Sequence, residues 1–490
     1  MEVDCAIDSE YADEIAALLA PPSPQAVQDY FDQLLRTRKC CSLKVEHRGQ
    51  QGKGVYANKV FEEGELVLKD QMLVGAQHSS NKMDCLVCSH CFRFIGSIEL
   101  QIGRKLYFES LGFVATEGNS HRNQAFSHAS GESCSREMSE DEDKDTGACS
   151  DTDMKDKLIL PNDVIESLMD GHLVLPCSEK FTLPSVISCP GGCEEEHYCS
   201  ISCAEADWET SHSLLCMGVK QDDSRRNALL KFIEHSNGTN DIFLLAAKVI
   251  SSTILKYKSL KLSHVEDQKQ LKKSNGVDQS SFSLLLDAWK PISMAFKRRW
   301  WECISLPDDV GSKNETSFRM QIKELAFKSL QLLKKAIFDK DCAPLFSLEI
   351  YGHVIGMFEL NNLDLVVASP VEDYFIFIDD LPHPEKEEVD RITRPFLDAL
   401  GDDYSICCQG TAFFPIQSCM NHSCSPNAKA FKRDEDRDGQ AVITTMRLIS
   451  EGEEITISYI DEDLPYEERQ ALLADYGFVC KCQKCVVEEP

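Results

Sequence analysis

The grouping of the cysteines is the sequence feature that most constrains how this chain can fold. There are 23 cysteines, many of them in closely spaced sets at 85–91, 177–216 and 480–485. The acidic N-terminus resembles neither a secretory signal nor a mitochondrial presequence, and no apolar run reaches the about 18 residues that a membrane helix needs. We therefore expect a soluble intracellular protein with no membrane partner. Because that compartment keeps thiols reduced, close cysteine spacings indicate metal sites rather than disulfides.

The strong negative charge limits the classes of partner. The formal net charge is −30 and the pI is about 4.8. Binding to the phosphate backbone of DNA needs a basic face, so we expect no direct, sequence-specific DNA binding. An acidic protein can steer a basic polypeptide substrate toward itself, but acidity also simply keeps proteins soluble. Both interpretations of the charge stay open.

Hydrophobic periodicity separates helical from strand-like parts of the chain. The runs NNLDLVVASP at 361–370 and YFIFIDD at 374–380 are predicted strands. Residues 116–157 are rich in Ser, Glu and Asp and are expected to be a disordered acidic insertion. The predicted divisions are a helical extension (1–40), a β-rich part (41–84), a cysteine-rich region (85–216) interrupted at about 92–188, a helical insert (217–344), a second β-rich part (345–462) and a terminal cysteine segment (463–490).

The first two cysteine sets together supply ligands for two zinc ions. Residues 85–91 read CLVCSHC and residues 188–216 read SCPGGCEEEHYCSISCAEADWETSHSLLC. Structural zinc takes four thiolate or imidazole ligands, and His212 and Cys216 stand one helical turn apart. Cys88 can pair with Cys91 or with Cys85. The candidate ligands are Cys88, Cys91, Cys189, Cys193, Cys199, Cys203, His212 and Cys216.

The segment YCSISCAEADWETSHSLLC resembles the second half of a MYND zinc finger. In that family the first and third cysteine pairs share one zinc ion, which here implies Cys88, Cys91, Cys199 and Cys203. The second zinc ion is then held by Cys189, Cys193, His212 and Cys216. Phe92 matches the bulky apolar residue that follows the family's first pair, which favours Cys91 over Cys85. The resemblance also implies recruitment of transcription regulators through proline-containing segments.

Four further motifs together resemble the SET domain of lysine methyltransferases. They are GKGVYA at 52–57, NHSCSPN at 421–427, EGEEITISYI at 451–460 and DYGFVCKCQKC at 475–485. The last motif resembles a post-SET zinc segment. A tetrahedral site needs four ligands and this segment offers only three, so the resemblance implies Cys424 with Cys480, Cys482 and Cys485. Cys419 falls where the family usually has an apolar residue, and we expect it to be buried and inert.

The SET resemblance implies transfer of a methyl group from S-adenosylmethionine to a lysine amine. The amine must be neutral to attack, although free lysine has a pKa of about 10.4. A narrow aromatic channel excludes water and disfavours the ammonium form. The implied catalytic residues are Tyr459, whose hydroxyl would lie near the methyl group, and Tyr476 and Phe478, which would line the channel. The implied cofactor-binding residues are Gly52, Lys53, Gly54, Asn361 (or its neighbour Asn362), Ser418, Asn421, His422, Tyr459 and Phe478.

A SET domain split by a MYND finger resembles the SET-and-MYND protein lysine methyltransferases, and FPIQSCMNHSCSPNA is similar to the plant trithorax-related (ATXR-type) SET proteins. The implied fold is α+β: a SET β-core of small sheets with a crossed-over pseudoknot segment, a MYND insertion, a helical insert and a post-SET cap, with three zinc ions. The implied function is methylation of histone H3 in nuclear chromatin, with the cytoplasm as a second location. The alternatives are a methyltransferase of non-histone proteins and a catalytically silent scaffold for transcription regulators.

Overall fold

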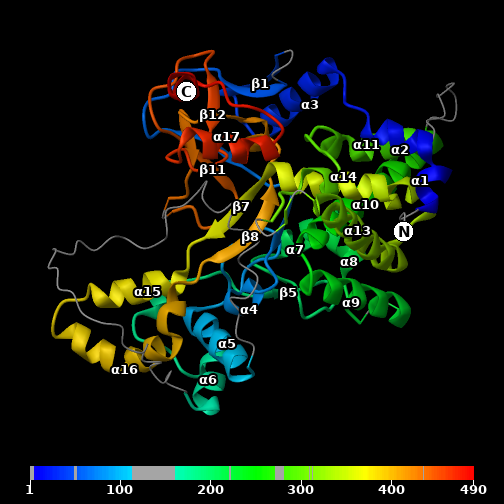
Figure 1. The fold of residues 1–490 in the computed structure, drawn as a ribbon. Helices are drawn as coiled ribbons and strands as arrows, with labels where there is room; N and C mark the ends of the chain where they lie inside the picture. The colour runs from blue at the N-terminus through cyan, green and yellow to red at the C-terminus, as the bar shows by residue number, and fades with distance from the viewer. Residues whose placement is uncertain are drawn as a thin grey trace.

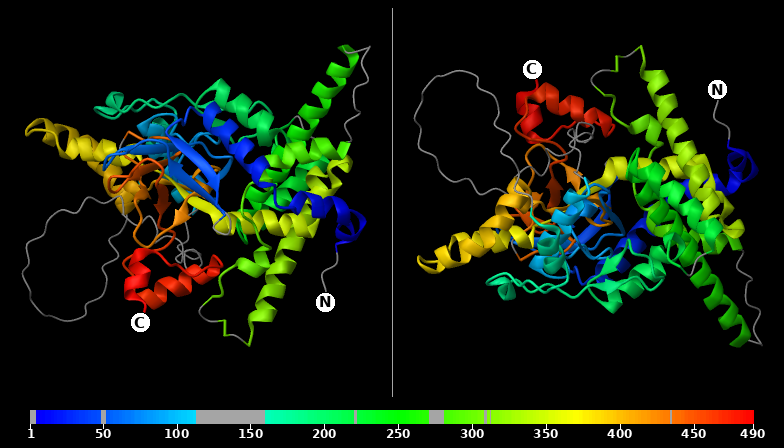
Figure 2. Two further views of the ribbon diagram at one scale, coloured as in Figure 1. Left: turned by 90° about the horizontal axis from the view of Figure 1, so that it is seen from above. Right: turned by 90° about the horizontal axis from the view of Figure 1, so that it is seen from below.

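The computed structural model describes residues 5–48, 52–112, 160–219, 222–270, 281–307, 310–311, 313–433 and 435–490. The insertion expected at 116–157 lies outside these residues. Figure 1 shows small sheets with one helical region on the right and another at the lower left, and the views in Figure 2 show the same arrangement. The fold is α+β, as predicted. Among the described residues, no helix has both the length and the apolar character that crossing a membrane requires.

The first sheet joins segments from the two ends of the chain. Its strand order is β1-β2-β12-β9. β12 pairs antiparallel with β2, with Ile455 opposite Val55, and parallel with β9, with Thr456 opposite Asn421. This pairing brings Asn421 and His422 beside the glycine-containing loop that precedes β2. The strands are β1 (Leu43–His47), β2 (Lys53–Ala57), β9 (Asn421–His422) and β12 (Glu454–Ile457).

Two three-stranded sheets complete the β-core. The strand orders are β10-β11-β3 and β4-β8-β7. β11 is buried along its whole length because strands flank it on both edges and side chains cover both faces. The strands are β3 (Leu66–Asp70), β4 (Val74–Gln77), β7 (Asn362–Val367), β8 (Cys408–Phe413), β10 (Ala428–Ala430) and β11 (Ala441–Thr445).

The N-terminal extension attaches to both the β-core and the helical insert. It consists of α1 (Ala6–Glu10), α2 (Ala12–Leu19) and α3 (Pro24–Thr37). In α3 the buried side chains of Val27, Phe31 and Leu35 recur every four residues and pack into the core beneath β1. α2 packs on the insert, where the Trp289 indole donates a hydrogen bond to the Leu18 carbonyl at 2.9 Å. The extension therefore links the β-core to the helical insert.

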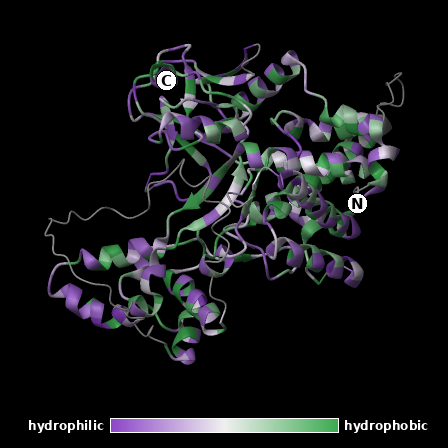
Figure 3. Cartoon of the chain, in the orientation of Figure 1, coloured by the Kyte–Doolittle hydropathy of each residue, from purple (hydrophilic) through white to green (hydrophobic). Residues whose placement is uncertain are grey.

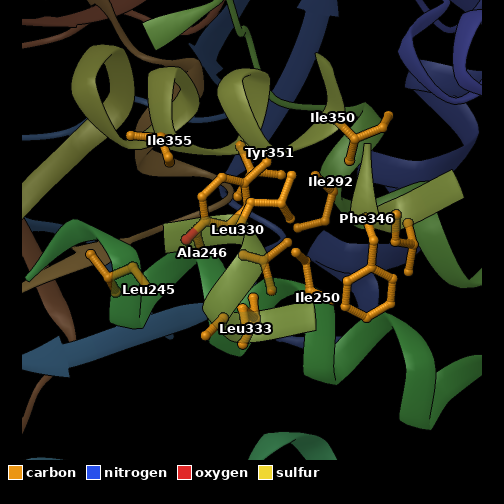
Figure 4. Close-up of a cluster of buried hydrophobic side chains, with 14 of the residues drawn as sticks. Leu245, Ala246, Ile250, Ile292, Leu330, Leu333, Phe346, Ile350, Tyr351 and Ile355 are labelled. Atoms are coloured by element: carbon orange, nitrogen blue, oxygen red, sulfur yellow. The ribbon is translucent and has the colours of Figure 1, made fainter. Parts of the chain in front are cut away.

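The helical insert is a bundle with its own hydrophobic core. Figure 4 shows side chains from different helices meeting there, among them Ile250, Leu330 and Tyr351. Each of these three residues is fully buried, and burying one such side chain stabilises the fold by about 1.5–3 kcal/mol. The helices are α9 (Asp223–Asn237), α10 (Ile242–Gln270), α11 (Ser281–Ser293), α12 (Trp300–Cys303), α13 (Glu315–Ile337) and α14 (Leu348–Asn361).

A second helical region corrects one prediction from the sequence. It combines α5 (Ile98–Ser110) and α6 (Asn162–Met169) with α15 (Pro370–Asp379) and α16 (Glu385–Leu400), the last largely hydrophilic (purple in Figure 3). The strand predicted at 374–380 is wrong, because this segment lies in α15 and its C-terminal cap. Ser369 caps the helix by accepting a hydrogen bond from the Val371 amide at 3.2 Å, and Pro370 occupies its first position.

Candidate active site and metal centres

Two groups of side chains that could hold a metal ion, here called metal-binding groups, form in the finger region. They are Cys88, Cys91, Cys199 and Cys203, and Cys189, Cys193, His212 and Cys216, with the ligand atoms of each group within 4.8 Å of one another. The Sγ of Cys199 lies 3.6 Å from that of Cys91 and 3.5 Å from that of Cys203. The Nε2 of His212 lies 3.2 Å from the Sγ of Cys189. Zinc about 2.3 Å from each sulfur of a tetrahedron separates the sulfurs by about 3.8 Å, so both groups fit zinc.

Local structure brings the finger ligands together. The hydroxyl of Ser200 accepts a hydrogen bond from the Cys203 amide at 3.1 Å, which caps α7 and places Cys203 in its first turn. His212 and Cys216 then lie one turn apart, as their spacing predicts. The elements are α4 (Asn81–Asp84), β5 (Ile187–Ser188), β6 (His197–Tyr198), α7 (Ile201–Asp207), the π-helical η5 (Trp208–His212) and α8 (Ser213–Leu215).

Cys85 lies apart from both groups. Its thiol donates to the Ile406 carbonyl at 3.5 Å, and the Asn81 amide donates to its sulfur at 3.7 Å. It packs in a different apolar cluster, beside Cys408. The geometry therefore favours Cys91, rather than Cys85, as the partner of Cys88.

Replacing Cys91 with alanine is expected to remove one zinc ion per chain, because three ligands would remain at that site. The matched variant Cys85→Ala should keep the zinc content of the wild type. Metal content of the purified proteins, measured by inductively coupled plasma mass spectrometry, checks both outcomes. Equal zinc loss in the two variants would contradict the assignment.

The third metal-binding group joins the β-core to the C-terminal segment. It consists of Cys424, Cys480, Cys482 and Cys485, again with ligand atoms within 4.8 Å. The Sγ atoms of Cys424 and Cys485 lie 3.5 Å apart, although 61 residues separate them in sequence. The Gln470 side chain accepts from the Cys480 amide at 3.0 Å and donates to its carbonyl at 3.1 Å. The segment is thus held between α17 (Tyr466–Asp475) and α18 (Gln483–Glu488).

The approach of the C-terminal segment to Cys424 brings together the aromatic residues expected in the channel. The ring of Tyr459 lies 5.2 Å from that of Tyr476 and 6.4 Å from that of Phe478, between centroids. The Tyr459 hydroxyl donates to the Met420 carbonyl at 2.5 Å. Burial raises the pKa of both tyrosines, so their hydroxyls stay protonated and can donate. The structure therefore brings all three predicted catalytic residues together.

His422 connects the aromatic cluster to the third group of candidate metal ligands. Its Nδ1 accepts from the Tyr459 amide at 3.0 Å, and its Nε2 lies 3.2 Å from the Cys424 sulfur. Burial, aided by the charge of Arg469, lowers the pKa of His422 to about 4, so the ring is neutral at physiological pH. Because Nδ1 accepts, the single ring proton is on Nε2 and points at the sulfur. The ring also lies 6.0 Å from Phe478.

The predicted glycine loop lies beside Asn421. The Asn421 amide donates to the Lys53 carbonyl at 3.0 Å and to the Glu454 carboxylate at 2.7 Å. A Cβ at Gly54 would come within 2.6 Å of that carboxylate, so a side chain there would displace the Glu454 carboxylate from its contact with Asn421. Gly52 has φ +74 and borders open space, since a Cβ at this position would have no neighbour within 4 Å. This combination of glycine loop and Asn421 fits a cofactor held against the backbone.

The weaker candidates make contacts with other parts of the chain. The Lys53 amine donates to the carbonyl of Met294 in the insert. The Asn361 amide donates to the Phe296 carbonyl at 2.7 Å, and the Ser418 hydroxyl donates to the Pro415 carbonyl at 3.3 Å. The side chain of Asn362 lies outside the described part of the chain. The segment 294–296 of the insert therefore borders the candidate cofactor site, which the sequence pattern did not indicate.

The fold and the site define a SET-domain methyltransferase. The SET domain family matches residues 52–460, and the chain belongs to this family of S-adenosylmethionine-dependent lysine methyltransferases. It is 62% identical over 480 residues to the histone-lysine N-methyltransferase ATXR2 of Arabidopsis thaliana, covering 98% of this chain and 97% of that protein.

More distant relatives share the SET-and-MYND type. The chain is 25% identical over 337 residues to the protein-lysine N-trimethyltransferase SMYD5 of Gallus gallus, covering 65% of this chain and 70% of that one. The Homo sapiens SMYD5 is 27% identical over 300 residues, covering 59% and 64%. The resemblance to SET-and-MYND and plant trithorax-related SET proteins is thereby confirmed.

Proposed function

We propose that this protein transfers methyl groups from S-adenosylmethionine to a lysine of histone H3 in nuclear chromatin. The observation that carries the proposal is the convergence of Tyr459, Tyr476 and Phe478 beside Asn421 and His422. The printed name of the Arabidopsis relative, a histone-lysine N-methyltransferase, supports the substrate class. The net charge of −30 suits a basic histone segment.

The chain's own residues would bind the reactants and exclude water. S-adenosylmethionine, when bound, supplies an electrophilic methyl group. Asn421, His422 and the glycine loop at 52–54 would hold it, with Lys53, Asn361 and Ser418 nearby. Tyr476 and Phe478 would keep water from the substrate lysine, which lowers the pKa of its ammonium group and yields the neutral amine. The Tyr459 hydroxyl and the Met420 carbonyl would orient that amine.

The zinc ions would have a structural role. Each group offers four thiolate or imidazole ligands and leaves no position open for a reacting water. The third ion would hold Phe478 and Tyr476 over the site. We further propose that the finger recruits transcription regulators, since Ile201 and Val219 expose 66% and 79% of their surface there.

Methylation of recombinant core histones and nucleosomes with labelled S-adenosylmethionine tests the proposal. Label on a lysine of H3, located by mass spectrometry, is the expected result. Cofactor binding without label on any histone would favour the non-histone substrate class. A folded, zinc-loaded protein that binds no S-adenosylmethionine would instead be a scaffold.

Substituting Tyr459 with phenylalanine is expected to slow methyl transfer by about tenfold or more and to change the number of methyl groups added, because the hydroxyl that orients the amine is lost. Mass spectrometry of the H3 product measures both effects. Tyr107→Phe removes a hydroxyl from the exposed side of α5, in the second helical region, and should leave rate and product unchanged. An unaltered product pattern in Tyr459→Phe would place the hydroxyl outside the channel.

A further inference from the structure

A buried ion pair lies behind the candidate cofactor site. Asp70, at the end of β3, is completely buried. Its Oδ1 is paired with the guanidinium of Arg38, the residue that follows α3, and the Arg38 side chain is only 15% exposed. Its Oδ2 accepts hydrogen bonds from the amides of Ile416 and Gln417, at 2.8 and 2.9 Å. One carboxylate thus joins the N-terminal extension to a segment 346 residues further along the chain.

The two amides belong to the segment that carries the reaction site. Ile416 is the N-cap and Gln417 the first residue of the 3-10 turn η8 (Gln417–Cys419), and the amides of these two residues have no partner within the turn itself. A carboxylate is the preferred acceptor at such an N-terminus. Two residues of the reaction site follow η8 directly. They are Met420, whose carbonyl accepts a hydrogen bond from the Tyr459 hydroxyl, and Asn421, which contacts the glycine loop. A shift at the start of the turn would therefore displace both.

We propose that Asp70, held in its charged form by Arg38, is a positioning residue that sets the placement of residues 416–421 for cofactor binding and methyl transfer. The inference rests on the proposed function. It also gives the N-terminal extension a role at the reaction site, because Arg38 is supplied by that extension. Neither residue touches the reactants; both act through the backbone amides of Ile416 and Gln417.

The charge state of Asp70 makes this role dependent on pH. The other titratable groups that face it are Tyr30 and Cys40 of the extension and Cys419 of η8. Burial raises the pKa of Asp70 to about 6, against the opposing effects of Arg38 and the two amides. Above that pH the carboxylate is charged and holds both the amides and Arg38. Below it the ion pair is lost, so affinity for S-adenosylmethionine should fall as pH drops through about 6.

The test compares cofactor binding and backbone exchange in the full chain. Asp70→Asn cannot accept from the amides and pair with Arg38 at once, so we expect S-adenosylmethionine to bind about tenfold more weakly by calorimetry at pH 7.5. Hydrogen exchange of the amides in 414–420 should be faster by a similar factor. The pH dependence between about 5 and 7 should flatten. Arg38→Met should weaken binding in the same direction, whereas Arg36→Met, which removes an exposed guanidinium from the last turn of α3, should not.

The outcomes separate the two proposals. If the wild type binds no S-adenosylmethionine, the proposed function fails. If it binds, but a folded Asp70→Asn protein keeps its affinity, its exchange rates and its pH dependence, the positioning role of Asp70 is wrong. If the Asp70→Asn protein does not fold, the comparison of Arg38→Met with Arg36→Met is the deciding test. Equal affinity of these two variants for S-adenosylmethionine would overturn the inference.

Discussion

Replacing His422 with alanine is expected to abolish detectable S-adenosylmethionine binding and to lower kcat/KM for histone methylation by about a hundredfold or more. The ring accepts from the Tyr459 amide and lies against the sulfur of Cys424. It also packs against the rings of Tyr459 and Phe478. Alanine would remove both polar contacts and leave a cavity beside the rings of Tyr459 and Phe478. Isothermal calorimetry and a filter-binding assay with labelled cofactor measure the two effects.

The control for this variant is His353→Ala. His353 lies in α14, where its Nδ1 bonds to the Glu349 carbonyl at 2.7 Å, away from the aromatic cluster. The His353→Ala protein should retain cofactor binding and activity close to those of the wild type. Near-normal affinity in a folded His422→Ala protein would move the cofactor site elsewhere on the chain.

Cys424→Ala is expected to reduce methylation activity about as strongly as His422→Ala. This change should release the third zinc ion and reduce methylation by about a hundredfold, because a structural site with three ligands binds zinc far more weakly and the binding free energy, of order 10 kcal/mol, is lost to the fold. The C-terminal segment would then no longer hold Tyr476 and Phe478 in the cluster. Zinc content and labelled-histone assays on the same preparation check the prediction.

Cys419→Ala provides the matched comparison. Cys419 is buried in the same segment, and its thiol donates to the Pro415 carbonyl at 3.4 Å, outside all three metal-binding groups. We expect three zinc ions and near-normal activity in this variant. If Cys424→Ala keeps three zinc ions, or loses one without losing activity, the third centre does not support the reaction site.

The metal-binding groups were the most predictable part of this protein. Cysteine and histidine spacing, combined with the four-ligand requirement of zinc, predicts the finger ligands as a set. The resemblance to MYND and post-SET segments implies how these ligands and Cys424 divide into the three groups that the structure brings together. Spacing alone cannot distinguish Cys85 from Cys91 as the partner of Cys88. The match of Phe92 to the family favours Cys91, and the packing of Cys85 beside Cys408, in a separate cluster, agrees with that choice.

The helices within residues 345–462, which the sequence predicted to be β-rich, were harder to predict. In α15 the β-branched and aromatic residues favoured a strand, yet Val371, Tyr374 and Phe375 are buried with the spacing of one helical face. That helical signal, together with Ser369 and Pro370 before it, was present in the sequence. α14 differs, because most of its sides are buried and its apolar residues show no clear period.

Asp70 and Glu454 show what local pattern cannot reveal. In the sequence each is an ordinary polar residue of a predicted strand, and no neighbouring residue identifies its hydrogen-bond partner. Asp70 meets amides 346 residues away, and Glu454 accepts from Asn421, 33 residues before it. Such contacts depend on tertiary structure. The strands of the β-core have to come together before either carboxylate meets its partners.

The joining of distant segments in the first sheet has a consequence for biosynthesis. While a ribosome is still translating this chain, β2 has no β12 to pair with, and Cys424 has no Cys485. The helices of the insert pack largely on one another and can form before the C-terminal strands are made, but the reaction site requires contacts between residues hundreds of positions apart. A nascent chain that has not yet reached Cys485 would thus be inert, and competence for methyl transfer would arise only after that residue has been added.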